Sequence, residues 1–565
     1  MTRRILFIVL FLLVGVFAVA MGANAESNGW ESVGEGIEYR EFLLPDPNKV
    51  YVARMELSNP NAIIESSIAQ GKLVDGLETV SSQANRYDQA LNWWGSPSIP
   101  HSDGAWGARN QVVVAINGTF TLPPDYEQQW EGQVHSGWYM WRFQDSATRN
   151  AFVWKLDRTT FIGDCVTHPS SKQLAHYQTG ATQEIAGVNV QREEDQLILY
   201  TPQYDRDTNT DNSGVEVLVE LTRPTLIVHP ERVNGYVREI RNSQGSTPIP
   251  FDHVVLSASG QAASRLKNNV SVGDQIGISQ LIKNCDSGST LDWSKTYASV
   301  VSNDFYFLKD GVYVYNDDYG ANVRNPRTAV AYNEAYIYFI VVDGRYKDVS
   351  IGMTMEQLAQ FARVELDADH GLSLDGGGSS TMVVNGQVVN FPSDGIPLSD
   401  ALDPVARLGA RYVFGLRGVP RSERYSNAVP QVYLPMLQRE YDNPGVEPDP
   451  TATPAPTPTP TPLPIVERSV PNGLMMVVVL PKESSSSFLP GEQVRINSYG
   501  NVNVRLGPGT NYGVINVVPN GTSGVILDHM NDLNGVNARG YYWWKVELGD
   551  IEGWVAESLL VKNNP

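Results

Sequence analysis

Four polar motifs in the chain carry residues that could do chemistry together. Three follow predicted strands: Asn117-Gly118, Asp343-Gly344-Arg345 and Asp375-Gly376-Gly377-Gly378-Ser379-Ser380. The fourth, Asn325-Pro326-Arg327-Thr328, precedes the predicted strand 329–331. If these strands lie in one sheet, two carboxylates, two arginines, an amide and two hydroxyls converge on one pocket. Glycines let backbone N–H groups approach an anion, and arginine presents a planar fork of donors to phosphate.

Taken singly, each motif also has a plainer interpretation. Asp-Gly-Arg after a strand is more often a turn, and Gly-Gly-Gly is more often a flexible loop. The glycine loop also lacks the Lys-Ser/Thr ending of a nucleotide-binding P-loop. The chemical interpretation therefore depends on the four motifs acting together.

The sequence also predicts the strands, the helix and the hairpin that position these motifs. Val112–Ile116 and 335–342 are continuous apolar runs, typical of buried strands. Thr354 to Gln357 is a capping box that predicts a helix with an apolar face, and a short strand over 372–374 leads into Asp375. Asn385-Gly386 lies between two strand-like runs and predicts a tight hairpin, because both turn residues need a positive φ.

Charge and the N-terminus limit the class of protein. The 565 residues carry 42 basic and 62 acidic side chains, a net charge of −20, which argues against nucleic acid as a partner. Residues 1–25 have a basic start, an apolar run and an Ala-x-Ala site, as in a cleaved secretory signal peptide. The alternative is an uncleaved membrane anchor. We expect a secreted, extracellular protein that is free of the membrane after cleavage and associated with the cell wall.

The sequence divides into four parts. After the signal peptide comes a large domain over 26–442, with its core motifs in 110–418, then a Thr/Pro-rich linker over 443–470 and a small domain over 471–565. Proline fixes φ and donates no hydrogen bond, so the linker should be an extended spacer. Cys165 and Cys285 could pair in an oxidising compartment or remain free. No Cys/His group has zinc-site spacing.

The sequence of the small domain predicts a β-barrel, because short strand-like runs are separated by Gly, Pro and Asn turns. Its segment 503–510, together with 544–546 and 553–555, resembles the bacterial SH3 family. That resemblance implies binding to cell-wall peptide or glycan. Trp543, Trp544 and Trp554 either serve binding or fill the core, and core filling is favoured for two of the three.

The large domain resembles the phosphodiester glycosidases, enzymes related to the one that removes N-acetylglucosamine from a phosphodiester. The matching pieces occur in family order: 115–120, 325–329, 342–345 and 374–381. The resemblance implies an α+β fold with a large mixed sheet, beside the all-β barrel. It also implies hydrolysis of a sugar 1-phosphate diester to free sugar and a phosphomonoester.

The resemblance assigns roles to the motif residues. Asp375 and Asp343 would be catalytic, activating water or stabilising an oxocarbenium-like centre, and which of them does which stays open. Arg327 and Arg345 would hold the diester charge. The remaining substrate-binding residues would be Asn117, Gly376, Gly377, Gly378, Ser379 and Ser380. No cofactor is identified, although the two aspartates could hold a divalent cation.

Two positions depart from the family pattern, and two other functions stay open. Thr119 stands where a second glycine is usual, and Asp403 stands where an arginine is expected, with Arg407 as a substitute. The alternatives are a non-catalytic glycan-binding protein and a glycosidase that cleaves an ordinary exopolysaccharide linkage. The aromatic segment 135–141 would be either a sugar-stacking platform or core filling.

Overall fold

The computed structural model describes most of residues 29–393 and 465–563. The breaks within these ranges fall at 75, 93–107, 123–126, 129–132, 142–149, 164–165, 224, 228–231, 286–287, 303–305, 315–319 and 530–532. The predicted signal peptide, residues 443–464 of the Thr/Pro-rich linker, Asp403, Arg407 and Cys165 lie outside the described residues, whereas residues 465–470 of the linker are described. Cys285 is described, and it is disulfide-bonded.

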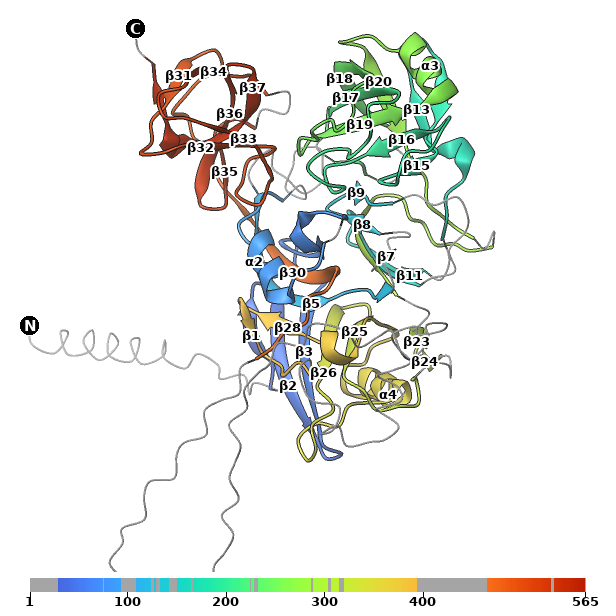
Figure 1. The fold of residues 1–565 in the computed structure, drawn as a ribbon. Helices are drawn as coiled ribbons and strands as arrows, with labels where there is room; N and C mark the ends of the chain where they lie inside the picture. Colours follow the sequence, from blue (N-terminus) through green and yellow to red (C-terminus); the bar gives the residue numbers. More distant parts are fainter. Residues whose placement is uncertain are drawn as a thin grey trace, which may run out of the picture.

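The centre of the molecule is a sandwich of two sheets (Figure 1). The first, sheet A, has eight strands in the order β1 (Glu31–Gly34), β2 (Ile37–Leu44), β3 (Asn48–Glu56), β26 (Tyr336–Val342), β25 (Arg327–Tyr332), β27 (His370–Ser373), β23 (Tyr306–Lys309) and β24 (Val312–Tyr313). Helix α4 (Met355–Glu365) packs on one face of this sheet through Leu358, Phe361 and Ala362. The other face packs against sheet B, so strands such as β26 are apolar on both sides.

Sheet B has five strands in the order β29 (Gln387–Val388), β28 (Met382–Val384), β5 (Ala108–Asn117), β30 (Asn472–Pro481) and β4 (Ala62–Ile68). Helix α2 (Val80–Tyr87) covers it through Val80, Ala84 and Tyr87. The capping box is confirmed, because Thr354 Oγ1 accepts from Gln357 N while the Gln357 side chain accepts from Thr354 N. The Asn385-Gly386 hairpin is also confirmed, with φ values of 47° and 76°.

Strand β30 corrects the expected organisation of the chain. The sequence predicts that residues 471–481 belong to the small domain, yet β30 pairs with both β4 and β5 in the middle of sheet B. The physical reason is the apolar run Leu474–Val479, whose side chains are all buried. A strand this apolar needs cover on both faces, which a small barrel does not offer.

A second β-rich unit, which we call the insert, is built between β9 (Trp138–Tyr139) and β22 (Thr296–Val301). Its eight-stranded sheet has the order β14 (Thr182–Glu184), β13 (Leu174–His176), β20 (Gln275–Ser279), β18 (Val233–Asn242), β17 (Val215–Leu221), β19 (His253–Ala258), β16 (Leu197–Tyr200) and β15 (Gly187–Val188), with α3 (Gly260–Asn269) beside it. The smaller described sheets are β11 (Thr160–Gly163) with β10 (Ala151–Lys155) and β22, β12 (Val166–Thr167) with β21 (Lys283–Asn284), β6 (Thr121–Leu122) with β7 (Glu127–Gln128), and β8 (Val134–His135) with β9.

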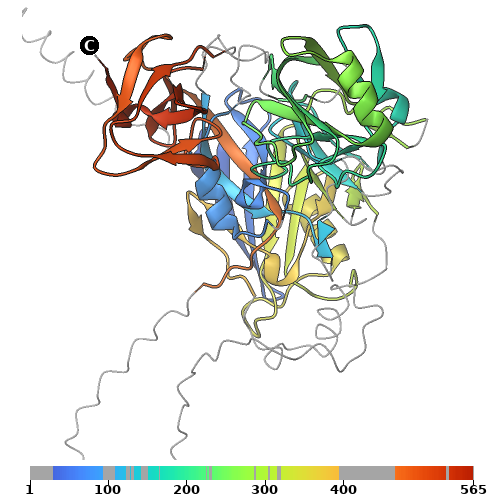
Figure 2. The same cartoon turned by 45° about the horizontal axis from the view of Figure 1, so that its top comes forward.

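The C-terminal barrel has the strand order β33 (Val514–Val518), β32 (Val502–Arg505), β37 (Ile551–Ala556), β36 (Tyr541–Leu548), β34 (Ser523–Ile526), β31 (Gln493–Ile496) and β38 (Leu560–Lys562), with β35 (Val536–Ala538) paired to β36. The barrel is docked on the rest of the chain. Trp543 and Trp554 belong to the same buried cluster as side chains of the two central sheets. Arg539 N donates to Gln89 O at 2.8 Å. Figure 2 shows the barrel and the insert side by side above the central sheets.

Strands dominate the described residues, as the sequence predicts. The expected mixed sheet is reduced to a single short parallel pair, β15 with β16, and every other described strand pair is antiparallel. Trp543, Trp544 and Trp554 are all buried, so the core-filling interpretation extends to all three. Trp138, Tyr139 and Met140 are buried as well, which favours core filling for that segment. Among the described residues, no helix has the length and apolar character needed to span a bilayer.

Candidate functional site

The four sequence motifs meet where the ends of sheets A and B lie together. β25 runs antiparallel to both of its neighbours, so its start at Arg327 shares an edge with the ends of β26 and β27. Those ends lead into Asp343 and Asp375. From sheet B, the end of β5 arrives beside them, because Asp375 N donates to Gly118 O at 2.9 Å. The motifs are therefore brought together by the edges of two sheets and not, as the sequence suggests, by one.

Asn117 holds this junction together. Its side chain is fully buried, with 0% exposure. Nδ2 donates to Asp375 O at 2.6 Å, and Oδ1 accepts from Thr328 Oγ1 at 2.8 Å and from Thr381 N at 3.2 Å. These bonds tie three segments to β5, so Asn117 acts as a positioning residue for the Asp375 loop.

The glycine loop after Asp375 passes very close to its neighbours. Residues 377–379 form one 3₁₀ turn, and Gly377 has a φ of 66°. A Cβ at Gly377 would lie 3.0 Å from Arg345 Nη2, and a Cβ at Gly376 would lie 2.7 Å from Pro326 O. Glycine is therefore required here by space as well as by backbone conformation.

Asp375 has the electrostatic setting of a reactive carboxylate. It is partly exposed, as are Gly376 and Gly377, whereas Gly378, Ser379 and Ser380 are buried. Burial raises its pKa from 3.8 to about 6, although a hydrogen bond from Ser379 and the positive charges of Arg468 and Arg345 act to lower it. Arg468 belongs to no motif and lies within the predicted linker 443–470, so the sequence does not indicate its role. Glu467, its neighbour, accepts from Ser81 N at 3.0 Å and so anchors that segment.

Asp343 is held much more firmly. Its carboxylate accepts from Tyr51 OH at 3.0 Å, from Asn390 Nδ2 at 3.0 Å and from Phe391 N at 3.1 Å. Burial raises its pKa to about 6, opposed by these hydrogen bonds. Since its oxygens are already occupied, Asp343 fixes the 390–391 segment beside the site. Tyr51 and Asn390 were not found from the sequence.

The two arginines of the motifs differ in their exposure and in their hydrogen bonds. Arg327 is buried, and its Nε and Nη2 donate to three carbonyls, those of Met353, Gly320 and Val323, at 2.7–2.9 Å. Burial lowers its pKa to about 10, with a smaller contribution from Arg345. Arg345 is partly exposed and donates from Nη1 to Ser393 Oγ at 3.3 Å. Arg345 is therefore the better placed of the two to meet an anion.

Several hydroxyls around the loop are buried without a protein partner. Ser379 and Ser380 are each only 1% exposed. Ser380 Oγ, Thr381 Oγ1 and Thr119 Oγ1 have no hydrogen-bond partner among the described residues. Buried polar atoms usually have partners, and exceptions are typical of sites that a ligand or an ordered water completes.

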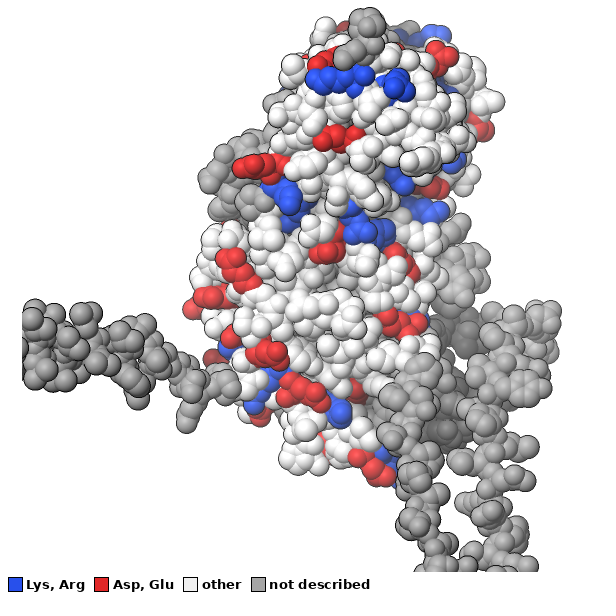
Figure 3. Space-filling model, turned by 90° about the vertical axis from the view of Figure 1, so that its left-hand side faces the viewer, with Lys and Arg blue, Asp and Glu red and all other residues white. Residues whose placement is uncertain are grey.

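Charged side chains of both signs lie on the surface. On the face shown in Figure 3, basic and acidic side chains of the described residues are interspersed, with no extended basic stripe. Nucleic-acid affinity depends on clustered lysine and arginine.

Two segments of the chain match known protein families. Residues 231–403 match the phosphodiester glycosidase family. This stretch contains the motifs of Arg327, Asp343 and Asp375 but not that of Asn117. Residues 500–561 match the bacterial SH3 domain. Both resemblances seen in the sequence are thereby confirmed, the first over a narrower range than 110–418.

Individual relatives are distant. Mouse N-acetylglucosamine-1-phosphodiester alpha-N-acetylglucosaminidase is 36% identical over 74 residues, which are 13% of this chain and 14% of that protein. Among solved structures, a Burkholderia pseudomallei protein has a TM-score of 0.40 at 20% identity, covering 62% of this chain and 72% of that one. The catalytic domain of the zebrafish enzyme of the same name as the mouse relative has a TM-score of 0.25 at 12% identity, covering 66% and 78%.

Proposed function

We propose that the chain is a secreted phosphodiester glycosidase that hydrolyses sugar 1-phosphate diesters in glycans or cell-surface polymers. The family match over 231–403 supports this assignment. The observation that carries it is the setting of Asp375, a partly exposed carboxylate with a raised pKa, influenced by Arg345 and Arg468. A carboxylate beside cations suits a substrate that develops positive charge at one atom and carries negative charge at the next.

The reaction needs few groups. Water attacks the anomeric carbon, the bond from that carbon to the phosphate oxygen breaks, and the phosphomonoester leaves with the electron pair. Asp375 takes the proton from the attacking water, and Arg345 and Arg468 neutralise the phosphate. Because phosphate is a good leaving group, a strong general acid is less necessary than in ordinary glycoside cleavage. The Ser380 hydroxyl would donate a hydrogen bond to the substrate.

Side chains whose polar atoms already hydrogen-bond to the protein have positioning roles in this proposal. Asp343 holds the 390–391 segment, Asn117 holds the Asp375 backbone, and Arg327 fixes the carbonyls that precede its own strand. Asp343 and Asn117 thus differ from the direct catalytic and substrate-binding roles that the family resemblance suggested. Both positioning roles can be tested by substitution of these residues.

The C-terminal barrel would bring the enzyme to cell-wall peptide or glycan after export directed by residues 1–25. Its tryptophans are buried, so binding would use the exposed barrel surface, where Tyr499 and Tyr541 lie. Sedimentation of the full chain with purified cell-wall sacculi tests this part. Failure to co-sediment would remove the wall-binding role and leave the hydrolase proposal standing.

Turnover is tested with UDP-N-acetylglucosamine and a panel of simple sugar-phosphate diesters. We expect release of free sugar by the wild type and at least a hundredfold loss of rate in Asp375→Asn, of the order that removal of a catalytic acid or base produces. Asp367→Asn is a matched control, because Asp367 is an exposed carboxylate in the same domain. Glycan binding without turnover would favour the non-catalytic alternative, and turnover of ordinary glycosides alone would favour the exopolysaccharide alternative.

A further inference from the structure

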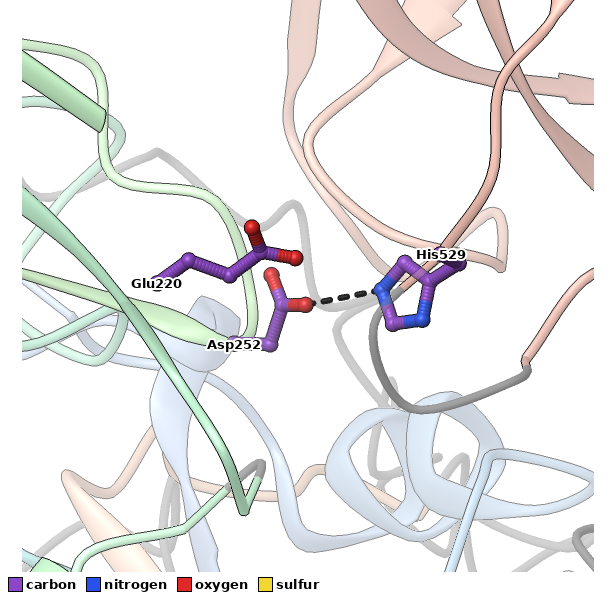
Figure 4. Close-up of side chains that lie close together, drawn as sticks. All are labelled: Glu220, Asp252 and His529. Carbon is purple, nitrogen blue, oxygen red and sulfur yellow. Dashed lines mark hydrogen bonds and ion pairs between the residues drawn. The ribbon is translucent and has the colours of Figure 1, made fainter. Parts of the chain in front are cut away.

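A groove of about 880 Å³ separates the insert from the C-terminal barrel. Glu220 and Asp252 line it from the insert, and Asp528 and Lys545 line it from the barrel. Beside Asp528, His529 points from the barrel toward both insert carboxylates (Figure 4). The groove is distant in sequence from every motif of the candidate active site.

Glu220, Asp252 and His529 form a compact buried cluster. Their exposed fractions are 4%, 1% and 3%. His529 Nε2 lies 2.8 Å from Asp252 Oδ2, and one ligand atom from each residue lies within 4.8 Å of the others. In the part of the chain that the structure describes, no other three His, Cys, Asp or Glu side chains gather in this way.

Further contacts orient the two carboxylates. Asp252 Oδ1 lies 2.7 Å from His253 Nδ1, which leaves Oδ2 directed at His529. Glu220 Oε2 accepts from Arg238 Nε at 2.6 Å, and no side chain or backbone N–H of the described residues donates to Oε1. In metal sites, outer hydrogen bonds of this kind fix the ligands in the orientation that the ion needs.

We propose that Glu220, Asp252 and His529 bind a divalent transition-metal ion, zinc being the best match, and that the ion joins the barrel to the insert. Imidazole nitrogen and carboxylate oxygen are both common zinc ligands, whereas calcium and magnesium prefer oxygen alone. Ligand bonds of about 2.0–2.1 Å place two ligand atoms of a tetrahedral ion about 3.3 Å apart. The contact between His529 and Asp252 needs to open by only about 0.5 Å to admit the ion.

The fourth ligand would be water from the groove, since Glu220 and Asp252 both line it. Three protein ligands and a water are the arrangement that zinc has at catalytic sites, whereas purely structural zinc sites usually have four protein ligands. Lys545 Nζ pairs with Glu552 at 2.7 Å, and its positive charge also acts on Asp252 and Glu220. The competing interpretation is a metal-free clamp, in which Lys545, Arg238 and the two histidines compensate the carboxylates.

The test uses the full chain without a histidine tag, stripped with a chelator and titrated with zinc chloride. We expect about one zinc bound per chain by elemental analysis, a higher unfolding temperature with zinc, and its reversal by chelator. Cobalt(II) should give the visible bands of a tetrahedral site with nitrogen and oxygen ligands. His529→Gln and Glu220→Gln should each lose the ion.

Glu220→Gln keeps the shape of the side chain and an oxygen for Arg238, so it remains informative if His529→Gln does not fold. His176→Gln is the matched control, because His176 is a partly exposed histidine of the insert outside the cluster, and it should keep the ion. Asp375→Asn should keep it too, which separates this site from the proposed active site. Wild type that binds no zinc in the titration, or zinc retained by both cluster variants, would overturn the proposal.

Discussion

Turnover at the proposed site should rise with pH through about 6. Burial raises the pKa of Asp375 from 3.8 to about 6, and the carboxylate must be ionised to take a proton from water. One pH unit below that pKa about a tenth of the molecules are ionised, and one unit above about nine tenths are. We therefore expect kcat/KM to fall about tenfold between pH 7 and pH 5, measured by sugar release at constant ionic strength.

Arg345→Gln provides the perturbation that identifies the titrating group. The positive charge of Arg345 lowers the pKa of Asp375, so its removal should move the acidic limb to higher pH. Arg363→Gln, a partly exposed arginine on α4, should leave the limb in place. Burial raises the pKa of Asp343 to a similar value, so Asp343→Asn must also be measured, and the limb should persist in that variant. A rate independent of pH between 5 and 7, or a limb that moves down in Arg345→Gln, would refute the reasoning.

Three further predictions concern stability. Asn117→Ala should lower the free energy of unfolding by roughly 2–5 kcal/mol in urea titrations, because it leaves three buried groups without partners; a loss below about 1 kcal/mol would contradict this role. Burial raises the pKa of Glu65 from 4.5 to about 8, so stability present below 4.5 should be lost as pH rises through 8. Thermal unfolding at pH 6 and 9 should then show a larger decline for wild type than for Glu65→Gln, and equal declines would exclude the effect. A fragment ending at residue 442 lacks β30 from the middle of sheet B, so it should show no cooperative unfolding by circular dichroism, and a sharp transition would contradict that pairing.

The local elements around the site could be predicted from the sequence because their signals are short-range. Apolar runs locate β5 and β26, the capping box begins α4 and Asn385-Gly386 closes the β28–β29 hairpin. Their polar ends could be recognised as a site because strand ends commonly carry function. The family resemblance then added the chemistry.

The long-range parts could not be predicted in this way. β30 follows the linker and pairs with strands that precede it by hundreds of residues. Its apolar run indicates a strand that is covered on both faces, but not the sheet to which that strand belongs. Arg468 acts on Asp375 only because β30 returns its segment to sheet B. The roles of Asn117 and Asp343 depend on which donors face them, and residue type alone does not distinguish a group that binds substrate from one that holds a loop.

Product analysis of a single defined diester tests the central claim most directly. Sugar 1-phosphate esterified to a simple alcohol is incubated in ¹⁸O-labelled water with wild type and Asp375→Asn, and both products are examined by mass spectrometry. Cleavage at the anomeric carbon should put the label in the sugar and none in the phosphomonoester, and Asp375→Asn should abolish it. Label in the phosphate would mean cleavage at phosphorus, and equal turnover by the variant would remove Asp375 from the reaction; either result would contradict the proposed mechanism.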